Sequence, residues 1–169
     1  MFFTVLDGGL PLEAAYLLTI QAVEVHHRRT GSSVILSGEE FDVLRKGLVA
    51  AIPEDTPAAM REKLEGALSF ANEPSLGQRL RALIAQMAVD FGPTPFGFDE
   101  ARVRSAVNTR NYYTHYSPKL ASKASQGVDL YHLIEAFRPL LFALLLAELN
   151  LPLADIRHHL HRRRAFNHV

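Results

Sequence analysis

Apolar residues recur every three or four positions along most of the chain, with polar residues between them. This spacing is typical of amphipathic helices, and no run shows the two-residue alternation of a strand. The pattern predicts helices over 12–29, from Ser37, from Thr56-Pro57, from Ser75, over 99–116 and over 128–149, with a short basic helix after Pro152. We therefore expect an all-α helical bundle of about five to seven helices. Its central helices should be 12–29, 99–116 and 128–149, which carry the most apolar faces.

Local signals mark several boundaries of these helices. Ser37 to Glu40 matches a capping box, in which two side chains satisfy backbone donors at the start of a helix. Asp99 should cap the helix that follows it. Glycine and proline in 92–97 predict a break, and residues 119–127 predict a polar connection between two helices. Pro139 predicts a kink in the last long helix.

The composition is that of a single soluble domain. Apolar residues make up 48% and charged residues 21% of 169 residues, so the chain can bury a sizeable core. We expect one domain over 1–169, with its core at about 12–149 and a basic helix or tail at 152–169. Cysteine is absent, which excludes disulfides. The most apolar run, 140–147, is too short to cross a bilayer. With no secretory signal at the N-terminus, the expected compartment is the cytoplasm, with no membrane partner.

The charge is balanced overall but uneven along the chain. The formal net charge is zero, so the chain as a whole is not a polycation that coats nucleic acid. Positive charge gathers in residues 151–169, where four arginines face one acidic residue: Arg157, Arg162, Arg163 and Arg164 against Asp155. This segment is either a solvated end or an arm that attracts phosphate.

The segment with most chemical content is Arg110-Asn111-Tyr112-Tyr113-Thr114-His115. Arginine binds phosphate in two-pronged fashion at any pH, and histidine exchanges its proton near neutrality. A second arginine–histidine pair at the same spacing, Arg163 and His168, lies in the polar tail without an apolar framework. The first pair, between two predicted helices, is therefore the candidate site.

The helical geometry of this segment favours a site made by two chains. Asn111 and His115 are four residues apart and share a face. Arg110 and His115 are five apart, which places them about 140° apart around the axis. Two such helices meeting about a two-fold axis would let the arginine of each chain approach the histidine of the other.

These groups suit the cleavage of RNA, which carries its own nucleophile, the 2′-hydroxyl. The reaction needs a base, an acid for the leaving 5′-oxygen and a cation for the charge on phosphorus. His115 can serve as base or acid, Arg110 can hold the non-bridging oxygens, and Asn111 can orient His115 or donate to phosphate. No metal or other cofactor is required.

The Arg-Asn-Tyr-Tyr-Thr-His segment, together with the first helix, Leu17-Leu18-Thr19-Ile20-Gln21-Ala22-Val23-Glu24-Val25-His26-His27-Arg28-Arg29, resembles the HEPN family (higher eukaryotes and prokaryotes nucleotide-binding). More narrowly, it is similar to Apea-type HEPN domains, from about Leu12 to Leu149. The resemblance implies a HEPN-type bundle that dimerises and forms a metal-independent endoribonuclease site from two motif copies. Arg110 and His115 match the catalytic pair of the family, and Asn111 matches the polar residue after the arginine.

The resemblance also bears on partners and biological role. It implies RNA and a second copy of the chain as partners, and leaves a sensing domain or an antitoxin open as a further one. Such domains serve in toxins, phage defence and RNA processing. The alternative function is a non-catalytic helical module for dimerisation or RNA binding. A nucleotide-binding sensor is disfavoured because the chain has no glycine-rich phosphate loop.

Other residues near the motif have two interpretations each. Glu24 can pair with Arg28 one turn later on an exposed face, or it can reach Arg110 and fix its side-chain conformation. The three tyrosines of the motif region can pack or stack on bases, and Tyr116, beside His115, is the best stacking candidate.

Histidines occur in two groups, 26–27 and 158–161. Adjacent residues on a helix point about 100° apart, and no carboxylate or cysteine completes a set of ligands. We therefore expect no metal site.

Overall fold

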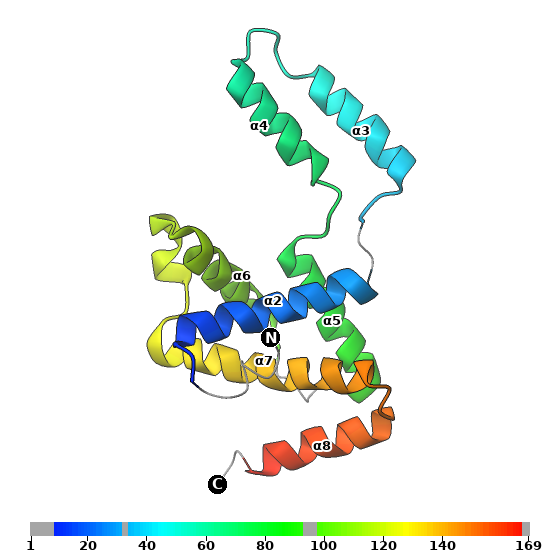
Figure 1. The fold of residues 1–169 in the computed structure, drawn as a ribbon, viewed down its shortest axis with the longest axis vertical. Coiled ribbons are helices and arrows are strands. Elements are labelled where there is room, and N and C mark those ends of the chain that lie inside the picture. Colours follow the sequence, from blue (N-terminus) through cyan, green and yellow to red (C-terminus); the bar gives the residue numbers. More distant parts are fainter. Residues whose placement is uncertain (1–8, 32–33, 93–97, 167–169) are drawn as a thin grey trace. The chain divides into compact units, whose positions relative to one another are not determined.

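The computed structural model describes residues 9–31, 34–92 and 98–166, with the side chains of 161–166 excepted. Within these residues the chain is all-helical (Figure 1). The helices are α2 (Leu12–Thr30), α3 (Gly38–Ala50), α4 (Ala58–Ser69), α5 (Leu76–Phe91), α6 (Glu100–His115), the 3₁₀ helix η1 (Pro118–Lys123), α7 (Gly127–Glu148) and α8 (Leu153–Phe166). The predicted all-α fold is confirmed.

The chain divides into two compact units, whereas we expected one domain over 1–169. The first unit is Met1–His27 with Leu76–Val169, and the second is Arg28–Ser75. The first unit contains the hydrophobic core and the Arg110 to His115 segment. The second unit contains α3 and α4.

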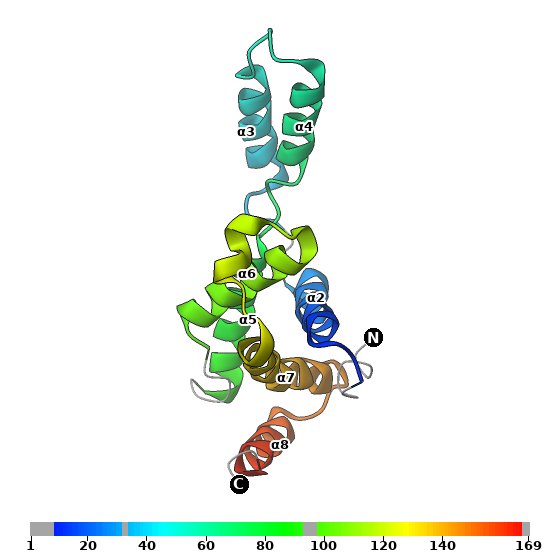
Figure 2. The same ribbon diagram turned by 90° about the vertical axis from the view of Figure 1, so that its left-hand side faces the viewer.

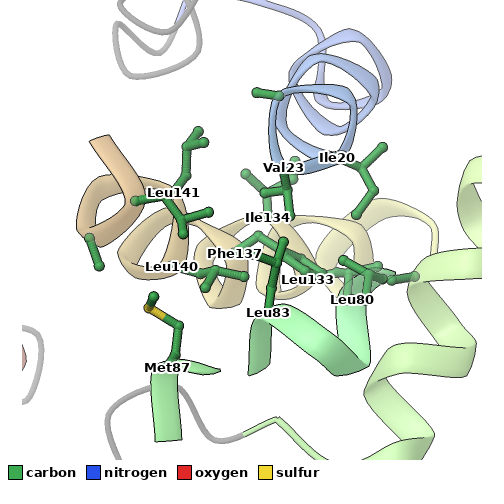
Figure 3. Close-up of a cluster of buried hydrophobic side chains, with 14 of the residues drawn as sticks. Ile20, Val23, Leu80, Leu83, Met87, Leu133, Ile134, Phe137, Leu140 and Leu141 are labelled. Carbon is green, nitrogen blue, oxygen red and sulfur yellow. The ribbon is translucent and has the colours of Figure 1, made fainter. Parts of the chain in front are cut away.

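The core of the first unit is built by α2, α5 and α7. Figure 3 shows their side chains converging, and all of the labelled residues are buried: Ile20, Val23, Leu80, Leu83, Met87, Leu133, Ile134, Phe137, Leu140 and Leu141. The prediction that α6 is a central apolar helix was wrong, because α6 buries only Val103, Ala106 and Thr109. The larger contribution comes from α5, whose apolar residues recur every three or four positions along one side.

α7 is a core helix that is also long enough to cross a membrane. By length and composition alone it passes that test, and 44% of its most apolar window is buried inside the structure. The uninterrupted apolar run 140–147 is too short to cross a bilayer, whereas the 22-residue helix as a whole is long enough. Pro139 lies within α7, and the helix continues through it.

The predicted helix starts on α3 and α6 are confirmed. The Ser37 hydroxyl accepts from the Glu40 amide, and the Glu40 carboxylate accepts from the Ser37 amide, which completes the capping box. The Glu40 carboxylate also accepts from the Ser37 hydroxyl at 2.8 Å, and this hydrogen bond, followed by the one from the Ser37 amide, lowers the pKa of Glu40. Asp99 accepts from the amide of Arg102 at 2.7 Å. Both signals are local, which is why sequence alone locates them.

Two predictions concerned the segments that connect helices. The polar connection predicted over 119–127 lies between α6 and α7, and its first half belongs to the 3₁₀ helix η1. Pro118 stands at the first turn of η1. Proline has no backbone N–H group, but an N–H group at this position would have no partner within the helix, so proline is tolerated there. The predicted break at 92–97 falls, from Pro93 onward, outside the described residues.

The second unit is a helical hairpin. α3 and α4 run antiparallel, side by side, in both views (Figures 1 and 2). At its base, the Asn72 side chain accepts from the Leu36 amide at 2.8 Å and donates to the Leu36 carbonyl at 3.0 Å. At its far end, Arg61 donates to the carbonyls of Ile52 and Pro53. Neither helix has a fully buried residue.

Candidate functional site

α6 is anchored to α2 through the hydroxyl of Tyr16. This hydroxyl donates to the carbonyl of Ala106 at 2.6 Å, across 90 positions of sequence. Tyr16 is completely buried, and burial raises its pKa, with the nearby charge of Arg110 acting in the opposite direction. The hydroxyl therefore stays protonated as a donor and fixes α6 one turn before Arg110.

A second set of contacts holds the other side of α6. The amide of Ser125 donates to the Thr109 hydroxyl at 2.9 Å, the Ser125 and Ser105 hydroxyls are 2.9 Å apart, and the Tyr113 hydroxyl donates to the Ser125 carbonyl at 3.3 Å. The three α6 residues are four positions apart and share one face. The connection into α7 is thereby fixed along two turns of α6.

Arg110 is held by two neighbours. Its Nη2 lies 3.7 Å from Oε2 of Glu24, and its Nη1 donates to Oδ1 of Asn111 at 3.1 Å. The Glu24 side chain is only 15% exposed, against 34% for Arg110. The structure thus brings Glu24 to Arg110, which is the geometry that the second interpretation of Glu24 requires.

His115 lies apart from Arg110 on the same helix. It is exposed at the last position of α6, and its side chain makes no hydrogen bond or ion pair with the described residues. Five residues of helix separate the two by about 140° around the axis. A single α6 therefore presents Arg110 toward α2 and His115 toward solvent, and a single copy does not bring them together.

The tyrosines form a cluster at the end of α6. The Tyr112 ring centroid is 5.1 Å from that of Tyr113 and 5.8 Å from that of Tyr116. Tyr113 is half-buried, and desolvation, followed by the charge of Glu13, raises its pKa. Tyr116 is 69% exposed and caps α6 with a left-handed backbone, φ 47°. Tyr116 is thus the ring of the three most available to a ligand beside His115.

The basic C-terminal segment is anchored rather than loose where the structure describes it. Ile156 and Leu160 of α8 are buried, and Arg157 donates to the Asp90 carbonyl at 2.7 Å. Arg162, Arg163 and Arg164 continue α8, and their side chains lie outside the described residues, as does His168.

Histidines of α2 occupy structural positions that sequence reasoning missed. His26 lies 3.3 Å from the Glu148 carboxylate, and His27 is buried with its Nδ1 3.3 Å from Nη1 of Arg79. Desolvation, then the charges of Arg79 and His26, lower the pKa of His27. Neutral His27 can accept a hydrogen bond from the arginine. Among the described residues, no group of three or more His, Cys, Asp or Glu side chains is placed to hold a metal ion.

A comparison with known protein families identifies the family of this chain. A family model described as Apea-like HEPN matches residues 17–155. The chain belongs to this family. No curated protein and no solved structure matched the chain. The matched HEPN region begins inside α2, includes the whole of α6 and ends in the first turn of α8, so Arg157 and the arginines after it follow the matched region.

Proposed function

We propose that this HEPN domain is a metal-independent endoribonuclease whose site forms when two copies of α6 meet. The observation that supports this most directly is the separation of Arg110 from His115. Arg110 is held by Glu24 and Asn111, whereas His115 is exposed on another side of the same helix. A two-fold axis beside α6 would bring the Arg110 of one copy to the His115 of the other, which is an isologous arrangement.

The reaction follows from these groups. His115 of one copy removes the proton from the 2′-hydroxyl, whose oxygen attacks the adjacent phosphorus, and an acid returns a proton to the leaving 5′-oxygen. With two copies present, the second His115 can supply that proton. Arg110 donates to the non-bridging oxygens as negative charge builds on them. The products are a 2′,3′-cyclic phosphate and a 5′-hydroxyl. The step consumes no water and requires no metal ion.

Glu24 and Asn111 act on Arg110 in this proposal. A guanidinium on a long, flexible stem loses conformational freedom when it grips phosphate. The Glu24 carboxylate and the Asn111 side-chain oxygen fix part of that freedom in advance, which favours tight positioning. Because Asn111 lies 40° from His115 around the helix, its amide nitrogen can also donate to a phosphate bound between the two.

RNA would reach the site over two surfaces. The exposed Tyr116 ring can stack on a base next to the scissile phosphate, without preference for its identity. Arg157, Arg162, Arg163 and Arg164 form a basic stretch that attracts the backbone. A role in phage defence or as a toxin, in the cytoplasm, is the biological part of this proposal. A sensing domain or an antitoxin would be the controlling partner.

The decisive experiment is incubation of the purified chain with RNA in the presence of EDTA. We expect cleavage that EDTA does not inhibit, cyclic-phosphate and 5′-hydroxyl ends, and no cleavage of DNA. His115→Ala and Arg110→Ala should each reduce the rate roughly 100-fold or more, while His168→Ala should match the parent. A requirement for Mg²⁺, 5′-phosphate ends, or full activity of His115→Ala would exclude the mechanism. Absence of any RNA cleavage would instead favour the alternative, a non-catalytic helical module for dimerisation or RNA binding.

A further inference from the structure

One side of α6 carries a line of polar residues that begins well before Arg110. Its members recur at intervals of four, three and four positions: Arg104, Asn108, Asn111 and His115. At 100° per residue, they lie within about 60° of one another around the helix axis. Each of them is also about 140–180° around the axis from Ala106, which is completely buried. We call these four residues the α6 polar face.

Arg104 does not pair with the acidic residue one turn before it. Glu100 and Arg104 are four positions apart, a spacing at which opposite charges commonly pair. Both oxygens of the Glu100 carboxylate are instead bound by Arg81 of α5, whose Nε and Nη2 donate to them at 3.0 and 2.6 Å. The Arg104 side chain is exposed and makes no hydrogen bond or ion pair within the described part of the chain. Its charge is therefore available to an anion from outside the chain.

The other members of the α6 polar face also have hydrogen-bonding groups without an internal partner. Asn108 is half-buried, and its side chain makes no hydrogen bond to any described residue. The side-chain oxygen of Asn111 accepts from Arg110, while its amide nitrogen donates to none of the residues that the structure describes. Together with the exposed His115, these amides give the face a row of donors that a ligand can use.

The charge around this face is positive over a long stretch of sequence. Residues 101–128 contain five basic side chains and no acidic one, whereas the whole chain has 18 of each. A solvated helix face usually mixes both signs, and a protein-binding face has few charges at its centre. A run of cations and amides without acidic residues instead suits a chain of phosphates.

We propose that Arg104 binds a second phosphate of the RNA strand that is cleaved at His115. The two residues are 11 positions apart, which is about 16 Å along the helix axis, so they cannot both contact the scissile phosphate. Asn108 and Asn111 lie between them and contact the nucleotides in between. This inference rests on the proposed function for the position of the scissile phosphate. It adds that the substrate is an oligonucleotide extending along α6.

A contact this far from the reacting atoms should act on binding and not on chemistry. The Arg104 guanidinium meets its phosphate equally well in the ground state and in the transition state, because no charge develops on a phosphate that does not react. Its loss should therefore raise KM and leave kcat nearly unchanged. A substrate with no second phosphate should not detect the loss at all.

The kinetic test compares an RNA oligonucleotide with a dinucleoside monophosphate, which has only the scissile phosphate. Arg104→Ala should raise KM for the oligonucleotide about 10-fold and leave kcat/KM for the dinucleoside monophosphate unchanged. Arg104→Lys, which keeps the charge, should recover much of the affinity. Arg102→Ala removes an exposed arginine about 160° around the same helix and should match the parent on both substrates. Equal loss on both substrates, or no loss on either, would overturn the proposal.

A binding test separates this proposal from the ribonuclease reaction. RNA with 2′-O-methyl groups lacks the nucleophile, so titration at several salt concentrations measures binding alone. Arg104→Ala should weaken binding and reduce the salt slope by about 0.7, the value for one phosphate of a single strand. If this effect is found in a chain that cleaves no RNA, the phosphate contact stands and the proposed function fails.

Two outcomes of the binding test would overturn the phosphate contact. The first is a parent protein that does not bind this RNA, or binds it with the same salt slope as Arg104→Ala. The second is a change in self-association of Arg104→Ala, measured by sedimentation, with RNA affinity unchanged, because the α6 polar face would then be a contact between proteins. Circular dichroism checks that each variant stays helical.

Discussion

Oε2 of Glu24 lies 3.7 Å from Nη2 of Arg110, in a place where the carboxylate is largely shielded from solvent. The two residues come from α2 and α6, which Tyr16 and Ala106 also link. α2 is therefore part of the support for the Arg110 to His115 segment. Four predictions follow from this arrangement and from its surroundings.

The first prediction concerns complementation between two inactive variants. If the site takes Arg110 from one copy and His115 from the other, and that single His115 serves as both base and acid, Arg110→Ala mixed with His115→Ala restores one intact site in each mixed dimer. Half of the dimers in an equal mixture are mixed, so activity should return to about a quarter of the parent value. Cleavage assays on each variant alone provide the baseline, and an inactive mixture would mean either that each site belongs to one chain or that the reaction needs the His115 of both copies.

The second prediction concerns Glu24 as a positioning residue. Glu24→Gln removes the charge that holds the Arg110 guanidinium, so kcat should fall roughly 10-fold with a smaller change in KM, because the loss is felt most in the transition state. Glu24→Asp should recover part of the rate. Glu39→Gln, on the exposed start of α3, is the matched control. An equal loss in Glu24→Asp and Glu24→Gln, accompanied by lower thermal stability, would indicate a merely structural role.

The third prediction concerns the basic segment. Removing α8 would expose the core around Ile156 and Leu160, so substitutions test this segment better than truncation. Replacing Arg162, Arg163 and Arg164 together by alanine should weaken RNA binding and reduce the salt slope by about 2, if each contacts a phosphate of a single strand. Binding titrations at several salt concentrations measure the slope. An unchanged slope would show that these arginines do not contact RNA phosphates.

The fourth prediction concerns pH and the buried His27. Because its pKa is lowered in the folded state, the unfolded chain binds a proton at a higher pH than the folded chain does. The resulting contribution to stability is complete above the ordinary value of 6.5 and is lost as the pH falls from there toward the lowered pKa. Urea unfolding above and below this range measures the loss.

The control for this effect keeps the contact and removes the proton. In His27→Asn the amide oxygen can still accept from Arg79, so the His27 part of the acid sensitivity should disappear. His159→Asn, on the exposed surface of α8, should retain it. Equal acid sensitivity in all three proteins would show that His27 does not cause it.

Sequence was most informative where the physics is local. The capping box at Ser37 and the cap at Asp99 depend on residues within one turn, and both were correctly predicted. The contribution of α6 was overestimated because its few buried residues, such as Ala106, are small, and its place in the fold depends on Tyr16, which is 90 positions away. No pattern within α6 encodes that partner.

The site was predictable in part for the same reason. The Arg110–Asn111 contact joins neighbours, and helical geometry alone gives the separation of Arg110 from His115. The Glu24 contact was one of two open interpretations, because choosing between them requires knowing which helix lies beside α2. The contact between His27 and Arg79 joins two different helices, and no sequence pattern around either residue indicates it.

The left-handed backbone conformation of Tyr116 affects which substitutions at this position stabilise the protein. A left-handed residue after a helix is best filled by glycine or asparagine, as at Asn150, φ 56°, whereas Tyr116 adopts φ 47° with a bulky side chain. Glycine at 116 would relieve this strain and remove the ring beside His115. Variants selected only for heat resistance should therefore accumulate Tyr116→Gly or Tyr116→Asn, and these variants should bind RNA more weakly if Tyr116 stacks on a base as proposed.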